Sequence, residues 1–312
     1  MQTTPWKEYR LSRLMLGTVQ FGLPYGVANR TGQPSYQDVV AIIAAAVAGG
    51  VNCFDTAAAY GTSEEVLGRA LRELGLLDRV MVVTKVRALS SEVLADKALT
   101  ARTIEQSVAD SRRRLGIECL PLVLFHHETD GVHLDVLEQL RARGWLRHAG
   151  VSCDNRPGRA QEFVAAGHAA ALQLPGNVLD RRHQDSGVFR EAATRNVAVF
   201  IRSVYLQGLL AMPEDLIPRV LRDVVPVRRR LATIAREAGM TLAELAVRYM
   251  LAKEGVTCVL VGVETVAQIH ENVAFFDRGP LPIDLLSAID AVVPALPETI
   301  LTPPLWPARS SL

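Results

Sequence analysis

The sequence has few cysteines and almost no net charge. Its 312 residues include four cysteines, Cys53, Cys119, Cys153 and Cys258, which form no Cys-x-x-Cys pair. We therefore predict reduced thiols, most of them in the core. Lys and Arg number 34 against 33 Asp and Glu, which gives a net charge of +1. A chain so close to neutral has no general electrostatic attraction to nucleic acid or to an anionic membrane, and we predict neither as a partner.

Long apolar runs and targeting signals are also missing. The longest apolar run, residues 39–51, is too short to span a bilayer and contains the pair Gly49-Gly50. The first ten residues contain no apolar signal core. These absences predict a cytoplasmic protein without a membrane segment.

No dinucleotide-binding fingerprint follows the first predicted strand. Residues 17–22 read Gly-Thr-Val-Gln-Phe-Gly, which is not Gly-x-Gly-x-x-Gly, and this argues against an open doubly wound sheet. No low-complexity segment, linker or break in composition divides the chain, and hydrophobic residues make up 49% of it. We expect residues 1–312 to form a single domain.

What the sequence does contain is a regular alternation of strand-like and helix-like segments. Strands are predicted at residues 14–18, 51–55, 80–86, 120–125, 148–152, 170–174, 197–203 and 256–263. Helices are predicted at residues 36–48, 62–74, 103–115, 134–143, 160–166, 188–194, 227–238, 242–253 and 266–276. Eight strands, each followed by a helix, predict an α/β protein built as one (β/α)8 barrel. One further helix is predicted outside the barrel at residues 281–293, and an irregular surface tail at 302–307.

Polar residues stand where several predicted strands end. Asp55 ends the second strand and Tyr60 follows on its loop, Lys85 lies in the third strand, and His126 follows the fourth. The carboxyl ends of barrel strands form the active-site face. A lysine within Val-Val-Thr-Lys-Val is costly to bury alone, so we expect Asp55 to pair with it.

These four residue types can together protonate a carbonyl oxygen. A tyrosine has a pKa of about 10 and is a poor acid at neutral pH. We expect the neighbouring ammonium of Lys85 to lower the pKa of Tyr60. A neutral His126 can donate a hydrogen bond that orients the carbonyl.

The same four residues fall on the catalytic positions of the aldo-keto reductases, and the surrounding sequence resembles that family. The matching sequence motifs are Leu-Gly-Thr at 16–18, Asp-Thr-Ala-x-x-Tyr-Gly at 55–61, Gly-Val-Ser at 150–152 and Glu-Asn at 271–272. The resemblance runs from about residue 14 to 272. It implies a barrel enzyme that uses NAD(P)H to interconvert a small-molecule carbonyl compound and its alcohol, with Tyr60 as the proton donor.

The resemblance also implies where the cofactor lies across the barrel mouth. Ser152 and Gln173 match the positions that hold the nicotinamide carboxamide, although Cys153 replaces the asparagine that often follows the serine. Arg202 stands where many members stack a tyrosine. The remaining implied contacts are Gly17, Thr18, Ser203, Leu206, Gln207, Gly208, Gly262, Val263, Glu264, Thr265, Gln268, Glu271 and Asn272.

The adenosine end departs from the family in one respect. Members that prefer NADPH usually carry Arg or Lys near the positions of Gly262, Glu264 and Gln268. A carboxylate at Glu264 would repel a 2′-phosphate and can accept a hydrogen bond from a ribose hydroxyl. We therefore expect NADH to be used at least as readily as NADPH, whereas members of the family usually prefer NADPH.

The substrate pocket is predicted by position alone. Gln20, Phe21, Tyr25 and His127 are expected to line it, and the polar His127 suggests a sugar or a small hydroxy-aldehyde.

Two other functions fit parts of the sequence. The histidines of residues 126–133 suggest a metal-dependent barrel hydrolase, although such sites usually draw ligands from several strand ends. The β-subunits of potassium channels share the aldo-keto reductase barrel and bind a nicotinamide cofactor while acting as regulators. A non-catalytic regulator of this type is the third hypothesis, beside the reductase and the hydrolase.

Overall fold

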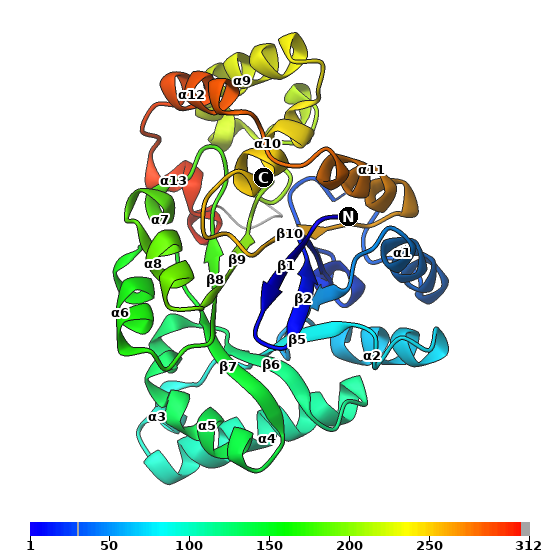
Figure 1. The fold of residues 1–312 in the computed structure, drawn as a ribbon, viewed down its shortest axis with the longest axis vertical. Coiled ribbons are helices and arrows are strands. Elements are labelled where there is room, and N and C mark those ends of the chain that lie inside the picture. The colour runs from blue at the N-terminus through cyan, green and yellow to red at the C-terminus, as the bar shows by residue number, and fades with distance from the viewer. Residues whose placement is uncertain (30, 307–312) are drawn as a thin grey trace.

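The computed structural model describes residues 1–29 and 31–306, and its centre is a closed barrel of eight parallel strands (Figure 1). The strands are β3 (Leu14–Gly17), β4 (Cys53–Asp55), β5 (Met81–Val86), β6 (Leu120–Phe125), β7 (Leu146–Ser152), β8 (Ala171–Pro175), β9 (Ala198–Arg202) and β10 (Cys258–Gly262). Each strand pairs with the next, and β10 pairs with both β9 and β3 to close the ring. The predicted (β/α)8 barrel is confirmed.

The barrel interior is filled by apolar side chains, so it is a core and not a channel. Met15, Cys53, Leu124, Phe200 and Leu260 belong to one buried cluster that the strands direct inward. Alternate residues of each strand point outward instead, because successive side chains of a strand face opposite sides. The outward side chains pack against the surrounding helices in a second, larger cluster.

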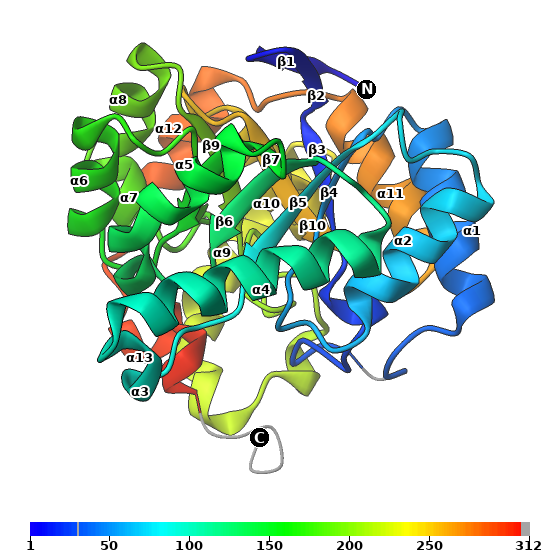
Figure 2. The same ribbon diagram turned by 90° about the horizontal axis from the view of Figure 1, so that it is seen from below.

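An N-terminal hairpin that the sequence analysis did not predict covers one end of the barrel (Figure 2). Its strands are β1 (Thr3–Trp6) and β2 (Tyr9–Ser12), joined by a two-residue turn in which Lys7 has a φ of 49°. Trp6 is 3% exposed and its ring lies 6.2 Å from that of Phe200 inside the barrel. The hairpin therefore closes the amino-terminal end of the barrel.

Helices surround the barrel. They are α1 (Tyr36–Ala48), α2 (Ser63–Glu73), α3 (Ser91–Leu94), α4 (Lys97–Leu115), α5 (Leu134–Ala142), α6 (Gly158–Ala166), α7 (Arg182–Asp185), α8 (Val188–Thr194), α9 (Val225–Glu237), α10 (Leu242–Leu251), α11 (Val266–Asp277), α12 (Ile283–Val292) and α13 (Glu298–Leu301). The predicted helix outside the barrel is α12. Among the described residues, no helix is both long and apolar enough to cross a membrane.

The start of one predicted helix and the predicted tail differ from the structure. Helix α4 begins at Lys97, six residues before the predicted start, because the Asp96 carboxylate caps it by accepting from the amides of Ala98 and Leu99. The tail follows α13 and contains a short 3₁₀ turn over Pro303–Leu305, and Trp306 is buried with its indole N–H donated to the carbonyl of Ile300. Pro307, the last residue of the predicted tail, lies outside the described residues.

Candidate active site

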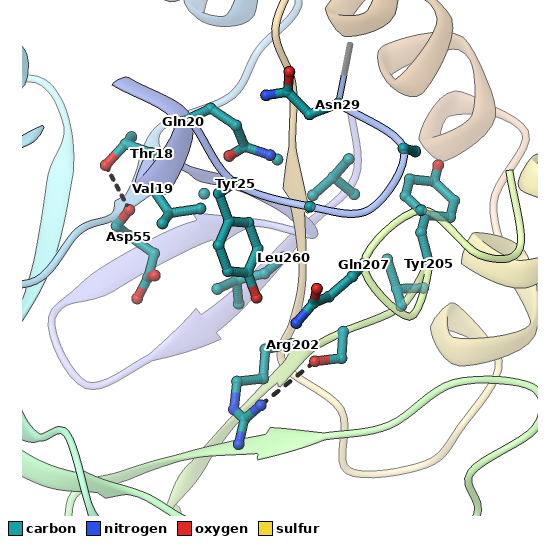
Figure 3. Close-up of a pocket in the computed structure, with 18 of the residues that line it drawn as sticks. Thr18, Val19, Gln20, Tyr25, Asn29, Asp55, Arg202, Tyr205, Gln207 and Leu260 are labelled. Carbon is teal, nitrogen blue, oxygen red and sulfur yellow. Dashed lines mark hydrogen bonds between the residues drawn. The ribbon is translucent and has the colours of Figure 1, made fainter. Parts of the chain in front are cut away.

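A cavity of about 480 Å³ opens at the carboxyl ends of the barrel strands (Figure 3). Its walls come from the strand ends and from the loops after β3, β9 and β10. It brings together most of the predicted site residues, which are Gly17, Thr18, Gln20, Tyr25, Asp55, Tyr60, His126, His127, Ser152, Gln173, Arg202, Ser203, Gln207, Gly208, Gly262, Glu264, Gln268, Glu271 and Asn272.

The four residues predicted at successive strand ends meet at the base of this cavity. The Lys85 ammonium lies 2.7 and 2.8 Å from the two carboxylate oxygens of Asp55, and it also donates to the Thr56 carbonyl at 2.9 Å. The Tyr60 hydroxyl is 3.5 Å from the same ammonium. The ring of Tyr60 meets that of His126 edge to face, with centroids 5.5 Å apart. The expected pairing of Asp55 with Lys85 is present.

Packing and backbone bonds hold Tyr60 in its loop. The loop amides of Thr56 and Ala58 donate to the carbonyls of Val83 and Lys85 on β5. Gly22 lies against the Tyr60 carbonyl so closely that a Cβ at Gly22 would overlap it. Any side chain at Gly22 would therefore displace the tyrosine.

The start of α2 ties this loop to β3. Ser63 is the first residue of α2, and no side chain caps this helix. Its buried hydroxyl instead donates to the Thr18 carbonyl at 2.7 Å and lies 3.0 Å from the Thr56 hydroxyl. Ser63 thus links the loops after β3 and β4.

The electrostatics of Tyr60 differ from the prediction. Burial and the negative charge of Asp55 raise the pKa of the Tyr60 hydroxyl above its ordinary value, and the charge of Arg202 offsets this only in part. The Lys85 ammonium is bound to Asp55 and to Thr56, so its charge is already compensated. The expected lowering of the Tyr60 pKa by Lys85 is therefore corrected, and Tyr60 holds its proton.

Burial also sets the charge state of the neighbouring bases. It lowers the pKa of His126 to about 3, with smaller contributions from the charges of Lys85, His127 and Arg202, so this imidazole is neutral at physiological pH. Burial lowers the pKa of Lys85 as well, and the adjacent Asp55 opposes that shift. The expected neutral His126 is what the structure shows.

Gln173 and Cys153 extend the network toward β8 and β9. Gln173 donates its amide N–H to Asp55 at 2.7 Å, which leaves its carbonyl oxygen to the cavity. The Cys153 amide donates to the main-chain carbonyl of Gln173, which is distinct from the side-chain oxygen at the cavity, and the Cys153 carbonyl accepts from Arg202 at 3.0 Å. Burial raises the pKa of the Cys153 thiol, so the thiol is un-ionised. Cys153 therefore contributes its backbone to the site.

The opposite end of the cavity is organised by helix α11. The side chain of Gln268 completes a capping box with Thr265, and its amide oxygen accepts from the backbone N–H of Glu264 at 2.6 Å. Asn272 accepts a hydrogen bond from the Tyr205 hydroxyl at 2.6 Å and donates to the Gln268 carbonyl at 2.7 Å. These residues thus fix the loop before α11 against the loop after β9.

Five predicted site residues do not line the cavity. Lys85 lies beneath it, bonded to Asp55, and the Thr265 hydroxyl caps α11. Phe21, Leu206 and Val263 are fully or almost fully buried in the core between barrel and helices, so their side chains do not line the cavity. Their apolar side chains are more stable against that core than facing water.

Sequence reasoning missed part of the cavity wall. The missed residues are Val19, Gly26, Ala28, Asn29, Asp154, Val204, Tyr205, Ala211, Ala243, Leu260, Val261 and Pro304. Most lie on the loops after β3 and β9, within a few residues of predicted positions. Their closeness in sequence to predicted site residues is the one feature from which they could have been predicted.

The histidines after β6 do not gather into a metal site. His126 and His127 stack with ring centroids 5.3 Å apart, and His133 ends a 3₁₀ turn spanning Glu128–His133. Within residues 1–29 and 31–306, no three side chains of His, Cys, Asp or Glu converge as ligands for a metal ion. The arrangement thus offers no support for the metal-dependent hydrolase.

One wall of the cavity carries a buried polar group that a bound ligand could satisfy. Gln20 is 7% exposed, and its buried carbonyl oxygen accepts no hydrogen bond from the described residues. A Cβ at Gly262 would lie 2.6 Å from the Gln20 amide nitrogen, so the wall there is bare backbone. An unpaired buried acceptor is costly, and a ligand hydroxyl or amide would satisfy it.

Comparison with known proteins decides the family. A sequence model described as the Aldo/keto reductase family matches residues 13–294. The chain belongs to the aldo/keto reductase family. It is accordingly an NAD(P)-dependent oxidoreductase of carbonyl compounds and alcohols, as the resemblance implied.

Individual relatives agree with the family. The chain is 28% identical to a probable voltage-gated potassium channel subunit beta of Arabidopsis thaliana, over 94% of this chain and 98% of that protein. It is 25% identical to an NADH-specific methylglyoxal reductase of Escherichia coli, over 86% and 90% of the two chains. The fold is similar to that of the aldo-keto reductase AKR11C1 from Bacillus halodurans in its holo form, with a TM-score of 0.78, 22% identity, and coverage of 95% and 97%.

Proposed function

We propose that this aldo-keto reductase reduces the carbonyl group of a small polar substrate, such as a sugar or a small hydroxy-aldehyde, with Tyr60 as the proton donor. The observation that carries the proposal is the convergence of the Tyr60 hydroxyl, the Lys85–Asp55 pair and the His126 ring at the base of one cavity. The bound nicotinamide would supply the hydride.

The protein's own groups then have distinct tasks. Tyr60 holds its proton until the carbonyl oxygen gains negative charge, when the adjacent Lys85 ammonium stabilises the developing tyrosinate. Neutral His126 donates a hydrogen bond to the same oxygen and orients it. Asp55 keeps Lys85 charged and in place, since a lysine buried to this degree would otherwise lose its proton.

The cofactor would lie along the cavity from Gln173 to α11. Ser152, with the free carbonyl oxygen of Gln173, would hold the nicotinamide carboxamide. Ser203, Gln207 and Gly208 would lie beside the pyrophosphate. Gly17, Thr18 and Gly262 would allow close approach, and Glu271 with Asn272 would hold the adenine.

We also propose that NADH serves at least as well as NADPH. Glu264 lines the adenosine end, and its backbone and carboxylate are both held by Gln268. A fixed carboxylate disfavours the 2′-phosphate of NADPH by charge repulsion. The NADH-specific methylglyoxal reductase among the relatives shows a similar chain with that preference.

The first test combines cofactor titration with a Tyr60→Phe variant. We expect both nicotinamides to bind the wild type, and Tyr60→Phe to bind them equally while kcat for aldehyde reduction falls by about 10²–10⁴-fold. Tight cofactor binding without turnover of any carbonyl in the wild type would favour the regulator function instead. That second function is kept because of the similarity to the potassium channel subunit.

The cofactor preference is tested by Glu264→Gln, with Glu271→Gln as a matched control at the same end of the cavity. We expect the affinity for NADPH relative to NADH to rise about tenfold in Glu264→Gln, a change of about 1.4 kcal/mol. An unchanged ratio, or a wild type that strongly prefers NADPH, would contradict the role given to Glu264.

A further inference from the structure

The strand β9 delivers the guanidinium of Arg202 to the cavity, where no carboxylate of the described residues pairs with it. Arg202 donates to the Cys153 carbonyl at 3.0 Å and to the Ser203 hydroxyl at 3.4 Å, and both acceptors are neutral. Among residues 1–29 and 31–306, no ion pair joins Arg202 to an Asp or Glu. A guanidinium carries five N–H donors, so most of its hydrogen-bonding capacity remains unused.

The backbone that carries the Arg202 side chain is held in place by neighbouring residues. The Arg202 carbonyl accepts from the amide of Gly176, next to β8, and Ser203 follows with a φ of 63°, which is unusual for a residue other than glycine. Asn177 supports that turn by donating to the Ser203 carbonyl at 3.2 Å. A strained backbone that its neighbours hold in place is a frequent mark of a functional position.

Arg202 also acts on the proposed proton donor. Arg202 lines the same cavity as Tyr60 and His126, and its positive charge opposes the rise in the pKa of Tyr60 and adds to the fall in the pKa of His126. Figure 3 shows the guanidinium on the cavity wall, below the Tyr25 ring and the Gln207 side chain. A partly buried cation with only neutral acceptors is costly unless an anion joins it.

We propose that the carbonyl substrate carries an anionic group, a carboxylate or a phosphate, and that Arg202 binds that group. The proposal rests on the carbonyl reduction proposed above and names its substrate class. The planar fork of a guanidinium matches two oxygens of either anion, and the existing bonds to Cys153 and Ser203 hold it ready. Arg202 then determines substrate specificity, while Tyr60 and His126 act on the carbonyl.

The test compares substrates that share the reacting aldehyde and differ by one anionic group. Succinic semialdehyde is paired with butanal, and glyceraldehyde 3-phosphate with glyceraldehyde, and kcat/KM is measured for each. We expect the wild type to favour at least one anionic member by tenfold or more. Comparison of the carboxylate pair with the phosphate pair shows which of the two anionic groups the site binds.

The decisive readout is the ratio of kcat/KM for the charged and uncharged members. In Arg202→Gln this ratio should fall by about 10- to 100-fold, as for loss of a charge-assisted hydrogen bond, whereas Arg202→Lys should keep part of it. If Arg202 only supports the cofactor or the loop, both substrates slow together and the ratio stays constant. That result would overturn the proposal.

Arg87 provides a matched control. It follows β5 on the same face of the barrel, and its guanidinium donates to the Ala58 carbonyl without lining the cavity. Arg87→Gln removes the same charge from this face, and we expect the ratio to stay as in the wild type. An equal loss in Arg87→Gln would assign the preference to the general field and overturn the assignment to Arg202.

A binding measurement separates failure of this proposal from failure of the proposed function. Calorimetry on cofactor-saturated protein compares the product 4-hydroxybutyrate with 1-butanol, and glycerol 3-phosphate with glycerol. Tighter binding of an anionic member, lost in Arg202→Gln, supports the anion site even if no carbonyl is turned over. Turnover of neutral aldehydes without any preference for anions keeps the reductase and rejects the anion site.

Discussion

The Lys85–Asp55 pair offers the sharpest test of the site's construction. The two side chains are 0% and 4% exposed, and the ammonium binds both carboxylate oxygens at 2.7 and 2.8 Å. Lys85→Met would leave the Asp55 carboxylate buried, with Gln173 as its remaining donor. Removing one partner of such a pair costs about 3–5 kcal/mol, mostly because the remaining charge loses its compensation.

The double variant Asp55→Asn/Lys85→Met distinguishes a paired charge from ordinary packing. It removes both charges and keeps similar volumes, so we expect its stability to lie within about 1–2 kcal/mol of the wild type. The coupling energy of the cycle should then be at least about 3 kcal/mol. Asp55→Asn alone should resemble Lys85→Met, because it leaves a buried ammonium with neutral acceptors only.

The assay is equilibrium unfolding in urea at pH 7, followed by both fluorescence and circular dichroism. Coincident curves are needed before a free energy of unfolding is taken from a chain of this length. A loss below about 1 kcal/mol in Lys85→Met, or simple additivity in the double variant, would refute the buried pair. Turnover should be abolished in all three variants.

Two further expectations concern other parts of the barrel. Because the folded state holds His126 at a pKa of about 3, below the usual value near 6.5, its contribution to stability is complete above pH 6.5 and falls as the pH drops. The loss should approach about 2 kcal/mol at pH 5. The difference in free energy of unfolding between wild type and His126→Asn, measured in urea, should therefore change by that amount between pH 7 and pH 5, and parallel curves would contradict the shift. At the other end, Trp6→Ala should cost about 3–5 kcal/mol by opening a cavity beneath Phe200, measured by urea unfolding at pH 7. Trp6→Phe should cost clearly less, because it also removes an indole N–H that has no partner among the described residues, and equal losses would contradict this.

The order of the barrel could be predicted because each strand is a short apolar run that ends in a recognisable turn. The catalytic quartet could be predicted because a lysine in the β5 sequence needs a charged partner, and Asp55 ends the neighbouring strand. The hairpin before β3 was missed, since its strands are four residues long and only one face of it is buried. Its two turn residues, Lys7 and Glu8, are not among the glycine-containing pairs that mark such turns, so the turn gave no signal in the sequence.

Side-chain direction is what the sequence could not supply. Leu206 and Gln207 are adjacent on the loop after β9 and were both predicted at the pyrophosphate, yet Leu206 points into the core and Gln207 into the cavity. Their backbones have φ values of 48° and 54°. A turn of this kind has no helix or strand repeat from which the direction of each side chain could be predicted. The pKa of Tyr60 was misjudged for a related reason, because the effect of Lys85 depends on how completely Asp55 compensates it.

The buried ion pair also bears on why these residues are present. An apolar pair of similar volume at the positions of Asp55 and Lys85 would stabilise the barrel at least as well, since burying two charges rarely adds net stability. The interior just below is already filled by Leu124 and Leu260, so packing does not require charge there. Restored stability together with abolished turnover in the double variant would separate these two requirements. It would assign the pair to the chemistry of Tyr60, with the fold tolerating it through Gln173 and Thr56.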